Sequence, residues 1–278
     1  MAGPGSTVAS NTRQGEAKMQ LDGKVAMVTG GARGLGRSMA LAYAREGADV
    51  AIVARTPSEL DAVSSEIRAF GRHAHTVNAE LTTSEGASRA ARDTVSELGK
   101  IDILVNNAGG YRLFTNDLTH SLSVLDITEE EWRRVMESNL TTTFMTCKAV
   151  LPHMMERRSG VIVNMTSKNV ARRGRAGQAS YGAAKAAVER LSESLADEVK
   201  DFGIAVNILD PGWNLTKPND DYDAEVHRRM RLPDDIAEVA VYMALQTPET
   251  MTGQLVSAPE YDEEHGIKRL SAYDRLHV

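Results

Sequence analysis

The stretch Lys24–Gly36, "KVAMVTGGARGLG", decides the fold of this 278-residue chain. Its first six residues are mostly apolar or β-branched, which is typical of a strand covered on both faces of a sheet. The glycine-rich turn "TGGARGLG" (Thr29–Gly36) follows directly, and a helical segment begins at Leu35. Glycines in such a turn allow positive φ angles and let the backbone approach a pyrophosphate at a helix N-terminus. The stretch therefore predicts a strand, a nucleotide-binding turn and a helix.

Short apolar runs like this one alternate with longer amphipathic segments along the chain. The expected strands are Lys24–Thr29, Asp49–Ala54, His73–Ala79, Ile101–Asn106, Gly160–Met165, Ile204–Leu209 and Gly253–Ala258. Helix starts are expected at Thr56–Glu59, where a threonine precedes a proline, and at the capping-box spacings Thr82–Glu85 and Thr128–Glu131. The alternation predicts an α/β fold, a Rossmann-like, doubly wound sheet of about seven parallel strands with helices on both faces. In such sheets ligands bind beyond the carboxyl ends of the strands.

The composition argues against several classes of protein. A formal charge of −6 does not suit a dedicated binder of nucleic acid or of acidic membranes. One cysteine, Cys147, rules out an internal disulfide, and no apolar run approaches the ~20 residues of a membrane span. Residues 1–20 are polar and lack the apolar core of a signal peptide, so we interpret them as a flexible tail and residues 21–278 as a single domain. We expect a cytoplasmic protein.

The end of the second expected strand bears on which dinucleotide binds. An acidic residue about 20 residues after the glycines would hold the ribose 2′-hydroxyl of NAD, but this chain has Ala54 followed by Arg55. Arg33 lies within the glycine turn, and two guanidinium groups would clamp a 2′-phosphate through charge-assisted hydrogen bonds. The alternative is that both arginines are solvated surface residues. We expect NADP(H) in preference to NAD(H).

Side chains suited to proton transfer follow the later strands. "NNAG" (Asn106–Gly109) ends the fourth expected strand, and Ser167 follows the fifth. Tyr181 and Lys185, in "YGAAK", are four residues apart and share one helix face. A nearby ammonium and a helix N-terminus favour the phenolate, so we expect a lowered tyrosine pKa, suited to general acid–base work. The Ser167 hydroxyl would hydrogen-bond the oxygen whose charge changes during reaction.

In this order "TGGARGLG", "NNAG", Asn139 in "ESNLTTTF", Ser167, "YGAAK" and "DPGWNLT" resemble the short-chain dehydrogenase/reductase family over about Leu21–Gln254. The resemblance implies that Tyr181 transfers the proton and that Lys185 lowers its pKa and binds the nicotinamide ribose. It implies that Ser167 orients the substrate oxygen and that Asn139 sustains a water relay. The catalytic set would be Asn139, Ser167, Tyr181 and Lys185.

The resemblance also implies that residues 21–278 form a dinucleotide-binding catalytic domain, and it implies which residues contact the dinucleotide. The glycine turn, the end of the second strand, the strand-four motif, the catalytic helix and the segment at the nicotinamide end would contact it. These positions are Gly30, Arg33, Gly34, Leu35, Gly36, Arg55, Asn107, Ala108, Gly109, Tyr181, Lys185, Pro211, Gly212 and Thr216. Asn106 would support the sheet beside them.

Three features differ from the usual family member and bear on the substrate side. The segment 110–127 is longer than usual and would drape side chains over the pocket, whereas the lid segment Trp213–Leu232 is short. The C-terminal "SAPEYDEEHG" lacks the usual glycine pair at a surface where subunits often pack. We therefore expect a homo-oligomer, either a tetramer or a dimer. Candidate substrate residues are Tyr111, Arg112, Arg172 and Trp213, with Phe114 beside them.

Several positions admit simpler roles. Arg172, Arg173 and Arg175 would attract a carboxylate, a phosphate or a thioester carrier, but charge runs usually face water, which favours a solvated loop. Asn139 has the alternative of a buried helix residue with local partners, and Thr166 is an alternative to Ser167 as the working hydroxyl.

Two further polar features are assigned no catalytic role. Asp102 is interpreted as structural. The pair His73 and His75 lacks further ligands nearby in the sequence, so no metal site is expected.

The sequence thus predicts an oxidoreductase that acts on CH–OH groups with NAD(P). We expect the reduction of a ketone to a secondary alcohol with NADPH, and with Tyr181 as proton donor. The same residues would serve an NAD(P)⁺-dependent alcohol dehydrogenase that works in the oxidative direction. A non-catalytic nucleotide sensor is the alternative from another class, disfavoured because a sensor does not need the tyrosine. Besides further copies of the chain, the expected partner is a small carbonyl or alcohol substrate.

Overall fold

The computed structural model describes residues 19–110, 123–216 and 224–276. Its strands form one parallel sheet in the order β3-β2-β1-β4-β5-β6-β7, which confirms the expected doubly wound α/β fold. The strands are β1 Val25–Thr29, β2 Asp49–Ala54, β3 Ala74–Asn78, β4 Ile103–Asn106, β5 Gly160–Met165, β6 Ile204–Asp210 and β7 Leu255–Ser257. The chain runs outward from β1 to β3, returns to β4 beside β1, and then runs to the other edge. The switch point lies between β1 and β4.

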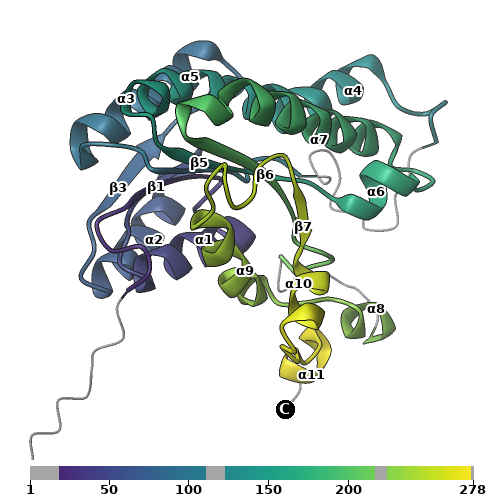
Figure 1. The fold of residues 1–278 in the computed structure, drawn as a ribbon. Coiled ribbons are helices and arrows are strands. Elements are labelled where there is room, and N and C mark those ends of the chain that lie inside the picture. The colour runs from purple at the N-terminus through teal and green to yellow at the C-terminus, as the bar shows by residue number, and fades with distance from the viewer. Residues whose placement is uncertain (1–18, 111–122, 217–223, 277–278) are drawn as a thin grey trace, which may run out of the picture.

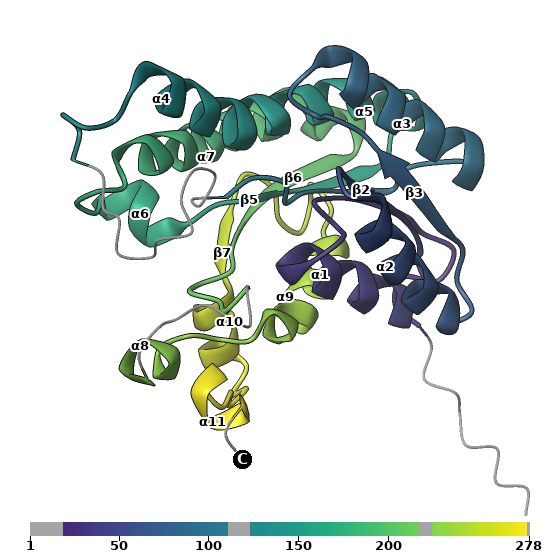
Figure 2. The same ribbon diagram turned by 180° about the vertical axis from the view of Figure 1, so that it is seen from behind.

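Helices cover both faces of the sheet (Figures 1 and 2). One face carries α1 (Gly34–Arg45), α2 (Pro57–Ala69) and α9 (Ala237–Ala244). The opposite face carries α3 (Ser84–Leu98), α5 (Thr142–Arg157) and α7 (Ala179–Val199). Helix α4 (Glu129–Met136) and a π-helical turn (η1, Glu137–Thr141) lead directly into α5. No helix among the described residues is long and apolar enough to cross a membrane.

The strand sequences explain why both faces are covered. In β1, Ala26 and Val28 pack into the core under α1 and α9, and Met27 between them packs into the core under α3, α5 and α7. In β2, Val50 and Ile52 likewise face one core, and Ala51 and Val53 face the other. Side chains alternate across a strand, so a strand that is apolar at every position must be buried on both sides.

The helix starts follow the sequence signals with one shift. Thr128 and Glu131 form the expected capping box, with Thr128 N donating to the Glu131 carboxylate at 2.9 Å and Glu131 N donating to Thr128 Oγ1 at 3.2 Å. Helix α3 is capped by Thr83, whose Oγ1 accepts from Gly86 N at 3.1 Å. The expected cap, Thr82, is wrong by one residue, since its hydroxyl is held by a nearby glutamate carboxylate.

The C-terminal part is more helical than expected. Strand β7 is shorter than the expected Gly253–Ala258, and helix α10 (Ala258–Glu264) begins directly after it. Helix α11 (Ala272–Leu276) packs near α8 (Ala224–Arg228), and in Figure 1 these elements gather beyond the carboxyl ends of β6 and β7. A short helix, α6 (Lys168–Arg173), follows β5 at the same edge of the sheet. The atypical C-terminal sequence therefore lies beside the expected site.

Candidate active site

The glycine turn after β1 forms a cradle at the N-terminus of α1. Gly30 and Gly34 have φ angles of 63° and 53°. A Cβ at Gly36 would lie 2.2 Å from the Gly30 carbonyl oxygen, so only glycine fits there. The N-cap residue Arg33 makes no side-chain cap bond, which leaves the first N–H groups of the helix without that partner. Backbone N–H donors in a turn whose glycines have no side chains fit a pyrophosphate.

The strand-four motif is tied to this cradle by hydrogen bonds. The Thr29 hydroxyl accepts from the backbone N–H groups of Asn107 and Ala108, both at 3.0 Å, and donates to Val105 O at 3.2 Å. The Asn107 amide donates to the carbonyl oxygens of Thr29 and Gly30 at 3.1 and 3.2 Å. The turn after β1 and the turn after β4 therefore form one unit at the switch point, where ligands bind in sheets of this type.

The two arginines expected to bind a 2′-phosphate lie in solvent. Their side chains are each 73% exposed. Arg33 is 3.9 Å from a carboxylate oxygen of Glu59, and Arg55 is 3.5 Å from one of Glu80. Thr56 is the N-cap of α2 as expected, but its side chain makes no cap bond. Exposed ion pairs of this length are weak, so both guanidinium groups can turn toward a ligand.

Tyr181, Ser167 and Lys185 come together where β5 ends and α7 begins. The hydroxyl groups of Tyr181 and Ser167 share a hydrogen bond. Lys185, one turn further along α7, is buried, and its Nζ lies 5.7 Å from the Tyr181 ring centroid. That Nζ donates to the Met165 carbonyl oxygen at 3.0 Å. A hydroxyl pair with an amine behind it can hold a carbonyl oxygen and deliver a proton to it.

The electrostatics of this group differ from the sequence expectation. Burial raises the pKa of Tyr181 to about 12; the Asp210 carboxylate raises it as well, and only the hydrogen bond with Ser167 lowers it. Burial also lowers the pKa of Lys185 to about 8. The expectation of a lowered tyrosine pKa is therefore wrong for this arrangement, because desolvation dominates and the Lys185 amine is directed at Met165 O.

Thr166 and Arg172 share one buried carboxylate. The Thr166 hydroxyl donates to Oε1 of Glu189 at 2.8 Å, and Arg172 Nε donates to Oε2 at 2.9 Å. Thr166 is buried and its hydroxyl is engaged by Glu189, which favours Ser167 as the working hydroxyl. Arg172 was a substrate candidate, but its charge is engaged by Glu189. Sequence spacing contained a signal for Glu189, which stands four residues after Lys185 on the same helix face.

Asn139 is fully buried in the π-helical turn and holds the backbone after "NNAG". Its Nδ2 donates to the carbonyl oxygens of Val135 and Gly110 at 3.0 and 3.2 Å, and its Oδ1 accepts from Gly110 N at 3.0 Å. A Cβ at Gly109 would lie 2.6 Å from that Oδ1. Single π-helical turns are frequent at functional sites. The contacts show the side chain in a local structural role, and the water relay stays a prediction.

A buried amide network lies below the site and was not anticipated. Asn106 Nδ2 donates to Asn164 Oδ1 at 2.8 Å, and Asn164 Nδ2 donates to Ser192 Oγ at 2.8 Å. Cys147 packs against the Asn106 amide, and burial raises the pKa of the Cys147 thiol to about 12. The network joins β4, β5 and α7. Its signal in the sequence was the polar Asn164 within the otherwise apolar strand "GVIVNM".

The segment after β6 reaches back to the glycine turn. Gly212 has a φ angle of 72°, and a Cβ there would meet Pro259 of α10 at 2.8 Å. A Cβ at Gly34 would lie 3.5 Å from the Thr216 side chain, so two expected cofactor positions are neighbours. Leu35 packs against the core from the first turn of α1. Gly34, Leu35, Gly212 and Thr216, together with Pro211, are the positions on this side of the site that were expected to contact the cofactor.

The substrate side is only partly within the described residues. Tyr111, Arg112 and Phe114 lie outside them. A cavity of about 420 Å³ is bounded by α6, the turn after β6 and α10, and its lining includes two of the candidate substrate residues, Arg172 and Trp213, together with Arg173. The Arg175 guanidinium lies 5.9 Å from the Trp213 ring centroid, a cation–π contact.

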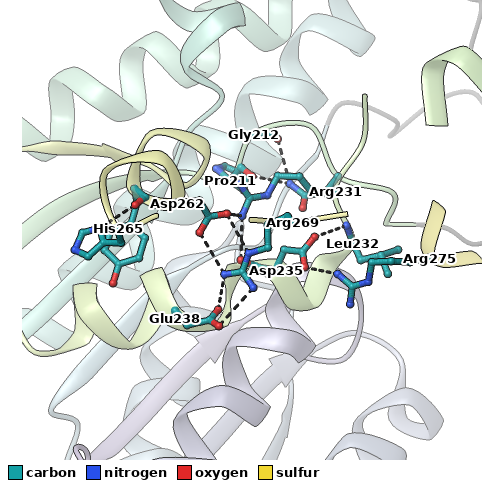
Figure 3. A network of polar contacts seen from close by, with 12 residues as sticks. Pro211, Gly212, Arg231, Leu232, Asp235, Glu238, Asp262, His265, Arg269 and Arg275 are labelled. Carbon is teal, nitrogen blue, oxygen red and sulfur yellow. Dashed lines mark hydrogen bonds and ion pairs between the residues drawn. The ribbon is translucent and has the colours of Figure 1, made fainter. Parts of the chain in front are cut away.

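Charged side chains of the C-terminal segment form a network with Arg231, Asp235 and Glu238 (Figure 3). Asp262 of α10 accepts from Arg231 at 2.8 Å and from Arg269 at 3.1 Å. Arg269 also pairs with Glu238 of α9 at 2.7 Å, and Arg275 pairs with the buried Asp235. Arg231 stands near the end of the expected lid. The sequence that replaces the usual glycine pair thus forms a helix and an ion-pair network within the chain.

A parallel sheet with a glycine cradle at its switch point and a Ser–Tyr–Lys group at the neighbouring strand ends defines the class, a Rossmann-type oxidoreductase. The family model described as short chain dehydrogenase matches residues 24–226. The chain belongs to the short-chain dehydrogenase/reductase family, whose members bind NAD(P) and act on CH–OH or carbonyl groups.

Relatives cover most of the chain. An uncharacterized oxidoreductase of Mycobacterium tuberculosis is 38% identical over 246 residues, 84% of this chain and 90% of that protein. A 3-oxoacyl-(acyl-carrier-protein) reductase of Chlamydia pneumoniae is 35% identical over 243 residues, 84% of this chain and 94% of that protein. The crystal structure of a candidate short-chain alcohol dehydrogenase from Sinorhizobium meliloti has a TM-score of 0.78 and 30% identity, and covers 87% of this chain and 97% of its own.

Proposed function

We propose that this protein reduces a ketone to a secondary alcohol with NADPH, and that Tyr181 donates the proton. The observation that carries the proposal is the shared hydrogen bond of the Tyr181 and Ser167 hydroxyls, with the Lys185 amine one turn behind them. The pair lies at the carboxyl edge of the sheet, as does the phosphate cradle. A carbonyl oxygen placed between the two hydroxyls would accept a hydrogen bond from each.

The residues of the cradle fit the dinucleotide. The turn at Gly30, Gly34 and Gly36 would receive the pyrophosphate, and the segment from Pro211 to Thr216 would lie along the nicotinamide half. Bound there, the cofactor supplies the hydride that adds to the carbonyl carbon. We propose Arg33 and Arg55 as the ligands of a 2′-phosphate, because both are cationic, exposed and held only by long ion pairs.

The protonation state of Tyr181 is compatible with the reductive direction. At neutral pH the phenol, whose pKa burial raises to about 12, carries the proton that the reduction of a ketone requires. As hydride adds to the carbon, the oxygen gains negative charge, takes the Tyr181 proton and becomes the alcohol. Ser167 stabilises that oxygen by its hydrogen bond. The buried Lys185 amine lies close enough to stabilise the phenolate that remains, until solvent returns the proton.

A β-ketoacyl thioester is the first substrate class to examine. The Chlamydia pneumoniae relative is named for the reduction of a 3-oxoacyl group on a carrier protein. The cavity beside Asp210 and Trp213 is large enough to receive part of such a chain. Small 3-ketoesters and 3-oxoacyl thioesters therefore belong in the same screen as simple ketones and secondary alcohols.

The substitution Tyr181→Phe tests the proposal. It removes only the hydroxyl, so we expect turnover with NADPH and an active ketone to fall by about 10³-fold, while NADPH binding, followed by the change in nicotinamide fluorescence, stays within about threefold. The matched control is Tyr273→Phe, on the remote helix α11. Undiminished turnover in Tyr181→Phe would remove Tyr181 as the proton donor.

A further inference from the structure

Asp210, the last residue of β6, carries a buried carboxylate that the proposed reaction does not yet use. It is 6% exposed. Its Oδ1 accepts from the backbone N–H groups of Lys168 at 3.2 Å and of Gly212 at 3.4 Å, and its Oδ2 accepts from the Ser257 hydroxyl at 3.0 Å. All three donors are neutral, and within the described residues no cationic side chain forms an ion pair with it.

These three hydrogen bonds join separate parts of the site. Lys168 directly follows Ser167 and begins α6. Gly212 belongs to the turn that would lie along the nicotinamide. Ser257 ends β7 and precedes α10, the helix against which Gly212 packs through Pro259. One carboxylate therefore sets the relative position of the serine turn, the cofactor turn and the C-terminal helix.

Hydrogen bonding alone does not require a charge at this position. An asparagine would accept both backbone N–H groups with its oxygen, and its amide would donate to the serine hydroxyl. A buried carboxylate without a cationic partner is unfavourable. The Asp210 charge does affect the proposed proton donor, because the carboxylate raises the pKa of the Tyr181 phenol, after burial itself.

Other ionisable groups lie on the elements around Asp210. Those that line the same cavity come from α6 and α10, and are Lys168, Arg172, Arg173 and Glu260. Tyr181 and Lys185 follow on α7. Two of the cations are already matched, Lys168 by Glu260 and Arg172 by Glu189. Among the carboxylates of this space, Asp210 is the one whose charge acts on the phenol.

We propose that Asp210 is a positioning residue that holds Ser167 and the Pro211–Gly212 turn in one arrangement and places a fixed negative charge beside Tyr181. The charge keeps the phenol protonated until the substrate oxygen develops negative charge. This role rests on the proposed function, in which Tyr181 is the proton donor. It would make Asp210 a determinant of the pH range in which the enzyme reduces rather than oxidises.

Two substitutions separate the charge from the hydrogen bonds. Asp210→Asn keeps the three contacts and removes the charge. We expect its kcat for ketone reduction near pH 7 to stay within about threefold, and the rising limb of alcohol oxidation, where the phenolate is the active form, to move to lower pH by roughly half a unit or more. Asp210→Ala removes the contacts, and kcat should fall by about 100-fold, as a displacement of about 1 Å can cause.

Controls make each outcome decisive. Asp197→Asn removes the same charge from the exposed end of α7 and should leave the profile unchanged. If Asp210→Ala does not fold, Ser257→Ala is used in its place, because it removes one of the three hydrogen bonds and keeps the charge. Its kcat should fall, while the pH profile of alcohol oxidation should stay where it is in the wild type. If the pH profile of Asp210→Asn superimposes on that of the wild type, the charge role is overturned. The positioning role is overturned if a folded Asp210→Ala keeps its full kcat. If Asp210→Ala does not fold, a full kcat in Ser257→Ala overturns it instead.

A spectroscopic measurement tests the charge without any turnover. The tyrosinate absorbance that Tyr181 contributes is the difference between a protein and its Tyr181→Phe counterpart during alkaline titration. With Asp210→Asn this difference should rise at lower pH than with the wild type. If no substrate is ever reduced, the proposed function fails while this titration still decides whether Asp210 acts on Tyr181.

Discussion

Arg172 donates from Nε to the Glu189 carboxylate at 2.9 Å, and Thr166 donates to the other oxygen of the same carboxylate at 2.8 Å. Glu189 is one turn beyond Lys185 on the buried face of α7. The Glu189 side chain is only 9% exposed, whereas that of Arg172 is 48% exposed. Arg172 therefore neutralises a buried carboxylate of α7. Because Arg172 lies on α6, the ion pair also holds α6 against α7, the helix that bears Tyr181.

Substitution of Arg172 should affect stability more than substrate recognition. Arg172→Gln leaves the buried Glu189 carboxylate without its cation, and we expect a loss of about 1 kcal/mol in the free energy of unfolding, reduced from the buried-pair value because the guanidinium is half exposed. Arg173→Gln, at the next position, has no ion pair within the described residues and should change the stability by less than about 0.5 kcal/mol. Denaturant unfolding of both variants measures the difference. A larger loss in Arg173→Gln would contradict this assignment.

The choice of cofactor should depend on Arg55. Arg55→Asp replaces a cation that can reach a 2′-phosphate by a carboxylate that repels it. We expect the ratio of kcat/KM for NADPH over NADH to fall by about 100-fold, because a charge-assisted hydrogen bond to the phosphate is replaced by repulsion. Arg45→Asp makes the same charge change at the far end of α1 and should leave the ratio unaltered. An unchanged ratio in Arg55→Asp would discard the proposed phosphate clamp.

The phosphate cradle should not tolerate a methyl group at Gly36. In Gly36→Ala the added Cβ would lie 2.2 Å from Gly30 O and 2.5 Å from Asn107 Nδ2, so the turn must open. We expect cofactor affinity to fall by at least about tenfold and the Tm to drop. Gly71→Ala is the matched comparison, since its φ angle is 74° with no atom near the new Cβ. It should cost only about 1 kcal/mol of backbone strain and retain the affinity. Equal cofactor affinities in the two variants would contradict the steric argument.

Asp102 should contribute stability to the fold at neutral pH that is lost in acid. Burial raises the pKa of this carboxyl, but hydrogen bonds from Arg157, Lys100 and the Val25 N–H outweigh burial, and the net pKa is lowered. A group whose pKa is lower in the folded state stabilises it above the unfolded value, near pH about 4, and loses that contribution as the pH falls through the folded value. Asp102→Asn should therefore be less stable by about 2 kcal/mol at pH 7.

The pH dependence distinguishes this from a simple loss of packing. The unfolding free energies of the wild type and of Asp102→Asn should converge as the pH falls below about 4. Asp61→Asn, at an exposed position of α2, should follow the wild type throughout. A stability difference for Asp102→Asn that is constant from pH 7 to pH 3 would show that its charge is not involved.

Much of the fold and the candidate site could be predicted because their signals are local. A strand that is apolar at every position indicates burial on both faces of the sheet. Gly30, Gly34 and Gly36 indicate a turn whose backbone conformation and close contacts exclude side chains. Tyr181 and Lys185 share a helix face by spacing alone. The capping box at Thr128 was also predictable, since both partners lie within one turn of helix.

The sequence by itself determined the alternation of strands and helices along the chain, the glycine turn and the position of Ser167, Tyr181 and Lys185 at strand and helix ends. Only the tertiary structure decided that Arg172 pairs with Glu189, that the segment after β7 forms α10, and that the Asp210 carboxylate acts on the Tyr181 phenol. It also decided that the pKa of Tyr181 is raised. The physical reason is that spacing along the chain specifies dihedral angles and exposed faces, whereas desolvation and charge pairing depend on which distant segments the sheet brings together.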